Sequence, residues 1–111
     1  MDPSIFQVFS ITKDASYSGE RVVKAGMCFR IYGKNLGFDF EDEKQGVFLA
    51  LKGDRKKAVR ITSFIRRTQR TIDAILPQNM EKGVYTVSFV KKNGEGSYPV
   101  ANTTDEIEVI E

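Results

Sequence analysis

Short runs of β-branched and aromatic residues, each ended by turn-forming residues, restrict the possible folds of this chain more than any other feature. From Met27 to Tyr32, for example, Met, Phe and Ile alternate with Cys, Arg and Tyr, which is the period of a strand with one buried face. Gly and Pro recur too often between the runs for long helices. The pattern predicts seven strands, at Ile5–Ile11, Met27–Tyr32, Val47–Leu51, Val59–Arg66, Ile72–Leu76, Val84–Val90 and Ile107–Ile110.

Seven short strands in 111 residues favour an all-β fold, an antiparallel β-sandwich, because each of two sheets can bury one face against the other. Residues 97–105 are expected to form an irregular approach to the last strand. The sequence contains no internal repeat, low-complexity tract or interdomain linker. We therefore expect residues 1–111 to form one domain, either a whole protein or a domain excised from a longer one.

The chain has no His and only one Cys, which removes common catalytic and metal-binding arrangements. A Ser-His-Asp triad, a Cys-His pair and an HExxH zinc site all need His, and a disulfide or a thiolate zinc site needs further Cys. We expect no enzymatic activity, no cofactor and no metal site. The net charge of +2 is too small to identify a polyanionic partner by itself.

Three features resemble the immunoglobulin-like domains of the IPT/TIG type. Residues 23–37 contain a Gly, an alternating strand and the closing sequence Gly-Lys-Asn-Leu-Gly, in which Leu36 replaces the aromatic residue usual in that family. Leu76-Pro77 followed by Gly83-Val84-Tyr85 is similar to the family's proline turn and Gly-x-Tyr strand. The opening strand with the long connection at residues 14–23 is the third correspondence.

The order of these features is most similar to the Ig-like domain of uncharacterised function that follows an HU-like DNA-binding domain in Bacteroides-type bacterial proteins. The resemblance implies a non-catalytic interaction or accessory domain, whose partner is the adjacent HU-like domain, another protein or a further copy of the chain. It transfers no site residue, and no DNA-binding function, to the chain itself. In such a fold Phe29, Ile31 and Leu36 point inward, and Tyr85 caps a loop with its hydroxyl.

The N-terminal residues lack the features of a signal peptide, and no apolar run is long enough to span a membrane. If Met1 is the native start, we expect a cytoplasmic, nucleoid-associated protein that does not bind membranes. If Met1 was added to an excised domain, the location is open.

The strongest local charge lies in residues 52–70, where eight cations are opposed by one acidic residue. Such clusters favour phosphate backbones, because binding releases condensed counterions. Strand alternation places Phe64 on one face with Arg60 and Arg66, which would put a stacking ring between two cations. The alternative is a solvated edge strand that its charge protects against pairing. The candidate DNA- or partner-binding patch comprises Lys52, Arg55, Lys56, Lys57, Arg60, Phe64, Arg66, Arg67 and Arg70.

Acidic residues form two clusters opposite in sign to this patch. Residues 39–43 carry four carboxylates that could bind calcium, but they lack the regular spacing of a calcium loop, so a solvated loop is favoured. The second cluster closes the chain at residues 105–111 and could contact the basic surface of another copy or of a neighbouring domain.

Phe38 and Phe40 are expected to plug one end of the sandwich. If they point outward, they and Tyr98 could form a platform for a glycan or a peptide, and the chain would then be a surface or secreted module. Cys28 is out of phase with Phe29, shares a face with Arg30, and is interpreted as a structural residue rather than a reactive thiol.

Overall fold

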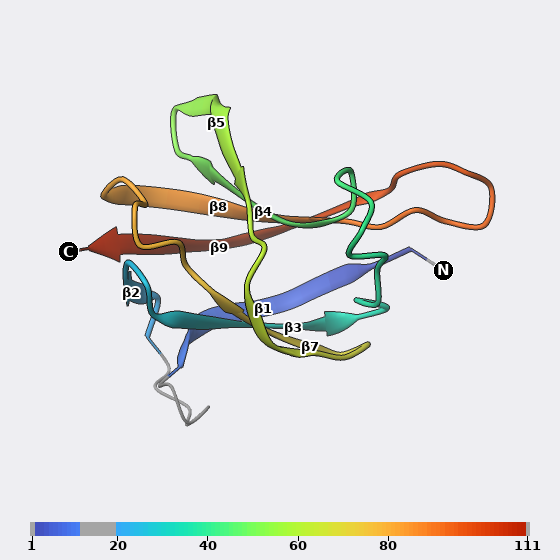
Figure 1. Ribbon diagram of the computed structural model, residues 1–111, viewed down its shortest axis with the longest axis horizontal. Helices are drawn as coiled ribbons and strands as arrows, with labels where there is room; N and C mark the ends of the chain where they lie inside the picture. The colour runs from blue at the N-terminus through green and yellow to red at the C-terminus, as the bar shows by residue number, and fades with distance from the viewer. Residues whose placement is uncertain (1, 12–19, 111) are drawn as a thin grey trace.

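Two β-sheets pack face to face in the computed structural model, which describes residues 2–11 and 20–110, with only the backbone at residues 54–57 and 104 (Figure 1). The first sheet has the order β1 (Ser4–Ile11), β3 (Cys28–Lys34), β7 (Thr71–Ile75), β6 (Phe64–Arg67). The second has the order β2 (Val22–Lys24), β9 (Val100–Ile110), β8 (Gly83–Val90), β4 (Gly46–Leu51), β5 (Asp54–Arg60). The prediction of an all-β sandwich is confirmed. The described residues form nine strands where seven were expected, and β2 pairs with β9 in parallel.

The predicted strand from Val59 to Arg66 is wrong, because the chain changes sheets within it. β5 ends at Arg60 in the second sheet, and β6 begins at Phe64 in the first. Ile61 lies in the crossing segment and is only 1% exposed, whereas Ile65 is 46% exposed. An alternating pattern persists through such a crossing because the core lies between the sheets, so the pattern alone does not reveal the crossing.

The last strand begins earlier than expected, so the predicted irregular approach at residues 97–105 holds only up to Pro99. β9 runs from Val100 and pairs with β8 through an irregularity between Thr86 and Ser88. Polar contacts hold its first part, since the Ser88 hydroxyl donates to Oδ1 of Asn102 at 2.7 Å. Such a polar stretch has no apolar alternation, which is the signal that marked the other strands.

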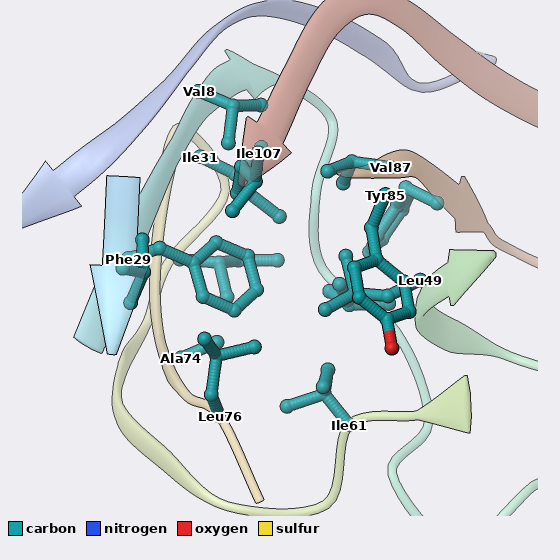
Figure 2. Close-up of a cluster of buried hydrophobic side chains, with 14 of the residues drawn as sticks. Val8, Phe29, Ile31, Leu49, Ile61, Ala74, Leu76, Tyr85, Val87 and Ile107 are labelled. Carbon is teal, nitrogen blue, oxygen red and sulfur yellow. The ribbon is translucent and has the colours of Figure 1, made fainter. Parts of the chain in front are cut away.

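The core fills the space between the two sheets, as Figure 2 shows for side chains from both layers. Phe29, Ile31 and Leu36 are fully buried, which confirms their predicted inward orientation. The prediction for Tyr85 is also confirmed: its ring is buried, and its hydroxyl donates to the carbonyl oxygen of Glu81 at 2.6 Å. The Tyr85 hydroxyl thus fastens the connection before β8.

The outer face of the first sheet has a small apolar cluster of its own, made by Phe9, Ile11 and Cys28 with Ile75 beside them. Cys28 is buried there, as expected for a structural cysteine. It lies on the same face as Arg30, because Cys28 pairs with Ile75 and Arg30 with Asp73 two positions along β3. Within the described residues, no helix has the length and apolarity needed to cross a membrane.

Candidate functional site

The members of the basic segment whose side chains the structure describes belong to two sheets and have different contacts. Nζ of Lys52 lies 3.2 Å from Oε2 of Glu106, and both side chains are largely solvated. The Arg60 guanidinium donates to the carbonyl oxygens of Gln45, Phe40 and Asp42 at 2.9, 2.8 and 3.2 Å. Arg60 therefore clamps the connection between β3 and β4. The side chains of Arg55, Lys56 and Lys57 lie outside the described part of the structure.

Arg66, Arg67 and Arg70 are exposed, and β6 places Arg66 and Arg67 on its opposite faces. A bulge between Phe64 and Arg66 changes the register, so Phe64 pairs with Ala74 and Arg66 with Asp73. The predicted arrangement of Phe64 between Arg60 and Arg66 is therefore wrong. Arg70 lies beyond β6, in the turn that leads to β7.

A different phenylalanine, Phe40, lies close to two arginines. The guanidinium carbons of Arg60 and Arg67 lie 5.4 and 4.9 Å from the ring centre of Phe40. Arg67 also lies 5.7 and 5.6 Å from the ring centres of Phe38 and Phe64, within the range of cation–π attraction. We call these five residues the arginine–phenylalanine cluster. Arg67 and Phe38 also line a hollow of about 520 Å³.

The cluster closes the end of the sandwich where the β3–β4 and β8–β9 connections lie (Figure 1). Phe38 packs against the core residue Phe89, with ring centres 5.6 Å apart, so it plugs this end as expected. Phe40 is 36% exposed and extends the plug to the surface. Tyr98 is half-buried, and its hydroxyl donates to Asp42 at 3.1 Å. Of the three candidate platform rings, only Phe40 presents substantial surface.

The carboxylates of the acidic loop organise the loop itself. Asp42 accepts hydrogen bonds from the side-chain amide of Gln45 and the backbone amide of Lys44, both at 3.0 Å. These bonds, with that from Tyr98, lower the pKa of Asp42 because they favour its charged form. Asp39 similarly accepts from the backbone amide of Glu41 at 3.0 Å. Among the described residues, no three metal-ligating side chains come together in a way that could hold an ion.

A second hollow, of about 670 Å³, lies where β1, β3 and the β6–β7 turn meet near β9. We call it the outer-face hollow. Phe6 is 66% exposed and Tyr32 37% exposed, and the hollow also holds one residue of the basic segment. Its lining includes Phe6, Gln7, Tyr32, Arg21, Arg70 and Asp105.

Of these residues, the sequence predicts Arg70 as a site residue and Asp105 only as part of an acidic cluster. Two features of the sequence point to the exposed rings. Ile5 and Phe6 are adjacent apolar residues in one strand, and a regular strand cannot turn both toward the core. Tyr32 has the parity of Arg30, which marks the outward face of β3.

The fold and these surfaces define an immunoglobulin-like β-sandwich. Residues 7–105 match the model of a family described as a domain of unknown function (DUF4469) with Ig-like fold, and the chain belongs to this family. Among curated proteins, none matches the chain.

One solved structure resembles almost the whole chain: a "putative bacterial DNA binding protein" from Bacteroides vulgatus, with a TM-score of 0.70 and 19% identity. The likeness covers 96% of this chain and 46% of that one, so the chain spans less than half of that protein. A glucan utilization locus protein of Bacteroides ovatus, SGBP-B in complex with a mixed-linkage heptasaccharide, matches with a TM-score of 0.42 and 23% identity over 83% of this chain and 21% of that one. Only the first likeness bears on the fold.

Proposed function

We propose that this chain is a non-enzymatic accessory domain of a bacterial DNA-binding protein, and that it contacts a neighbouring HU-like domain, a protein partner or a further copy of itself. Two findings support this: the family has an Ig-like fold, and the chain resembles less than half of a protein described as DNA-binding. A cytoplasmic, nucleoid-associated location is part of the same proposal.

The arginine–phenylalanine cluster is the observation that carries the proposal. Arg67 lies over three phenylalanine rings, and among the described residues no carboxylate pairs with it. Arginine and aromatic residues are enriched among the side chains that dominate protein interfaces. A guanidinium already held against rings loses little side-chain entropy on binding, so Arg67 and Phe40 suit the anchor of a protein contact.

The test compares the natural gene product with the same product lacking this domain and with its Arg67→Ala variant. We expect removal of the domain to change the assembly mass in sedimentation velocity or the DNA affinity, and Arg67→Ala to reproduce the change in part. Arg66→Ala is the matched control, because Arg66 is the adjacent residue on the opposite face of β6. A gene product that binds DNA and assembles identically without the domain contradicts the proposal.

Direct binding of duplex DNA by the basic segment is a second candidate, favoured by the exposure of Arg66 and Arg70. Fluorescence anisotropy of a labelled duplex should then show an affinity that falls steeply with salt, because phosphate contacts release counterions. Replacing Arg66 and Arg70 together by Glu should abolish binding. Arg67 is left in place because its ring contacts stabilise the fold. Salt-independent binding, or none at low salt, contradicts this candidate.

A further inference from the structure

We propose that the outer-face hollow binds an unpaired nucleobase together with its phosphate, as presented by single-stranded nucleic acid. This goes beyond the proposed function, in which the domain contacts proteins or, in the second candidate, duplex DNA. Three properties of the hollow carry the inference: two exposed aromatic rings, an arginine with no acidic partner in the described part of the chain, and a volume suited to one or a few nucleotides.

The first ring belongs to Phe6, which the backbone turns toward solvent. The register of β1 against β3 shifts between Ile5 and Gln7, so Phe6 is the extra residue of a β-bulge. Bulges redirect a side chain that a regular strand would alternate. A phenylalanine that is 66% exposed at such a position contributes little burial to the folded domain and presents most of its surface to a ligand.

The second ring belongs to Tyr32, and its contacts hold it in place. The ring centre of Phe9 lies 5.5 Å away, and the guanidinium carbon of Arg30 lies 5.6 Å away. Nη1 of Arg30 also donates to the Tyr32 hydroxyl at 3.3 Å. Tyr32 pairs with Thr71 on one side and Gln7 on the other, so a fixed ring is flanked by groups that could bond a base edge. Stacking on aromatic side chains is the common mode of binding unpaired bases.

The charges of the hollow favour an anion. Asp105 is neutralised within the domain, since Arg21 lies 3.2 Å from its Oδ1 and the backbone amide of Val8 donates to its Oδ2 at 3.0 Å. Arg70 is exposed, and no carboxylate pairs with it among the described residues. The hollow therefore holds a free guanidinium beside two rings. A phosphate on a stacked base would use all three groups, whereas the carboxylate of an acidic peptide would use only the guanidinium.

The size of the hollow fits this ligand. Its volume of about 670 Å³ lies within the range of pockets that take small organic ligands. The exposed Phe6 ring at its margin leaves it open to solvent. A nucleotide within a longer strand could therefore enter without the strand having to end there.

The test measures anisotropy of a fluorescein-labelled oligothymidine of about ten nucleotides, at about 50 and about 200 mM salt. We expect binding that weakens with salt. Phe6→Ala should lower the affinity about tenfold, in line with the loss of one stacked base, and Arg70→Ala should reduce the salt dependence. Ile65→Ala and Lys92→Ala are the matched controls, an exposed apolar side chain and an exposed cation outside the hollow, and should change little. Because Phe6 is exposed, its removal leaves the core intact, which thermal unfolding checks.

Competition experiments distinguish the sources of the ligand. Displacement of the oligonucleotide by unlabelled oligothymidine but not by thymidine monophosphate supports a strand as the natural source. Equal displacement by thymidine monophosphate supports the same hollow with a free nucleotide as its ligand. Displacement by polyglutamate at equal charge, equal binding of duplex and single strand, an equal loss in Ile65→Ala, or no binding at low salt each overturns the proposal. Failure here leaves the assembly experiment on the natural gene product unaffected, so the two proposals fail separately.

Discussion

Asp73 is a fully buried carboxylate on the outward face of a sheet, where solvated residues are usual. The Arg30 guanidinium donates two hydrogen bonds to this carboxylate, from Nε to Oδ1 at 2.6 Å and from Nη2 to Oδ2 at 2.9 Å. The hydrogen bond with Asp73 raises the pKa of Arg30, so the guanidinium stays charged throughout the accessible pH range. The pair joins β3 to β7, in addition to their backbone ladder.

Replacement of one member of this pair should be far more harmful than replacement of both. Arg30→Leu leaves the Asp73 carboxylate buried without its partner, and we expect the free energy of unfolding in urea to fall by about 3 kcal/mol. In the Arg30→Leu/Asp73→Leu double variant, no charge remains buried, and most of that loss should be recovered. Equal stability of the single and double variants would show that the pair does not compensate the burial of Asp73.

Tyr85→Phe should lower the free energy of unfolding by about 1 kcal/mol, because it removes the hydrogen bond to Glu81 but keeps the buried ring. Burial, and then the charge of Glu81, raise the pKa of Tyr85 in the folded state. Above pH about 10 the unfolded chain loses this phenolic proton while the folded chain retains it, so stability falls as pH rises.

The pH dependence needs a control, because the pKa of Tyr98 is also raised, by desolvation and by its bond to Asp42. Urea titrations between pH 8 and about 11 should show a shallower alkaline decline in Tyr85→Phe than in the wild type. The Tyr98→Phe variant measures how much of the alkaline decline in stability comes from Tyr98. An unchanged alkaline slope in Tyr85→Phe would contradict the argument.

At the scale of the elements, the crossing between β5 and β6 connects the two sheets through one buried side chain. Ile61 points into the core between the layers (Figure 2), while Ile65, on the next strand, points to solvent. The amide of Ile61 also donates to the carbonyl oxygen of Val47 at 2.9 Å. Ile61 is therefore part of the core, although Thr62 and Ser63 of the same segment are exposed.

Ile61→Ala should destabilise the domain by about 2–5 kcal/mol, because it opens a cavity between the sheets. Ile65→Ala makes the same chemical change at an exposed position and should cost less than about 0.5 kcal/mol. The continuous strand expected from the sequence would place both residues on one face, so similar losses in the two variants would favour that strand over the observed crossing. Equilibrium unfolding in urea measures both.

The individual strands show which parts of the fold local patterning can predict. Apolar patterning located β3, β4, β7 and β8 to within a residue or two, by alternation in β3 and β7 and by a continuous apolar run in β4. It missed β2, which is only three residues long, and the polar beginning of β9. It also missed the bulges at Phe6 and before Arg66, which decide where the arginines and the exposed ring point.

At the scale of the molecule, the sheet order demands contacts between distant parts of the chain. β3 pairs with β7, and β2 near the beginning pairs with β9 at the end (Figure 1). The entropy of closing long loops is lost before such strand pairs contribute any contact energy, so folding should be slow for a domain of this size. We expect refolding in stopped-flow fluorescence, with the tyrosines as probes, to take milliseconds to seconds. Refolding within microseconds would contradict this dependence on topology.

The distribution of charge was also decided at this scale. Residues 52–70 are strongly basic in sequence, yet Lys52 contacts Glu106, Arg60 binds carbonyls, and Arg66 and Arg67 lie on opposite faces. These four cations are close along the chain but do not share one surface, because the chain changes sheets within the segment. The outer-face hollow shows the converse, since Phe6, Tyr32 and Arg70 are far apart in sequence and meet only in the fold.

Local patterning was enough to establish the two-sheet sandwich and the inward side chains of β3, while the resemblance to immunoglobulin-like domains implied the role of Tyr85. Those features depend on the period of a strand and on the chemistry of single residues, which neighbouring positions in the chain reveal. Sheet order, bulges and the contacts of each arginine depend on pairs of residues that are distant along the chain. Interactions between such residues stabilise the fold only once the strands have paired. For that reason the candidate binding surfaces could be located only in the folded domain.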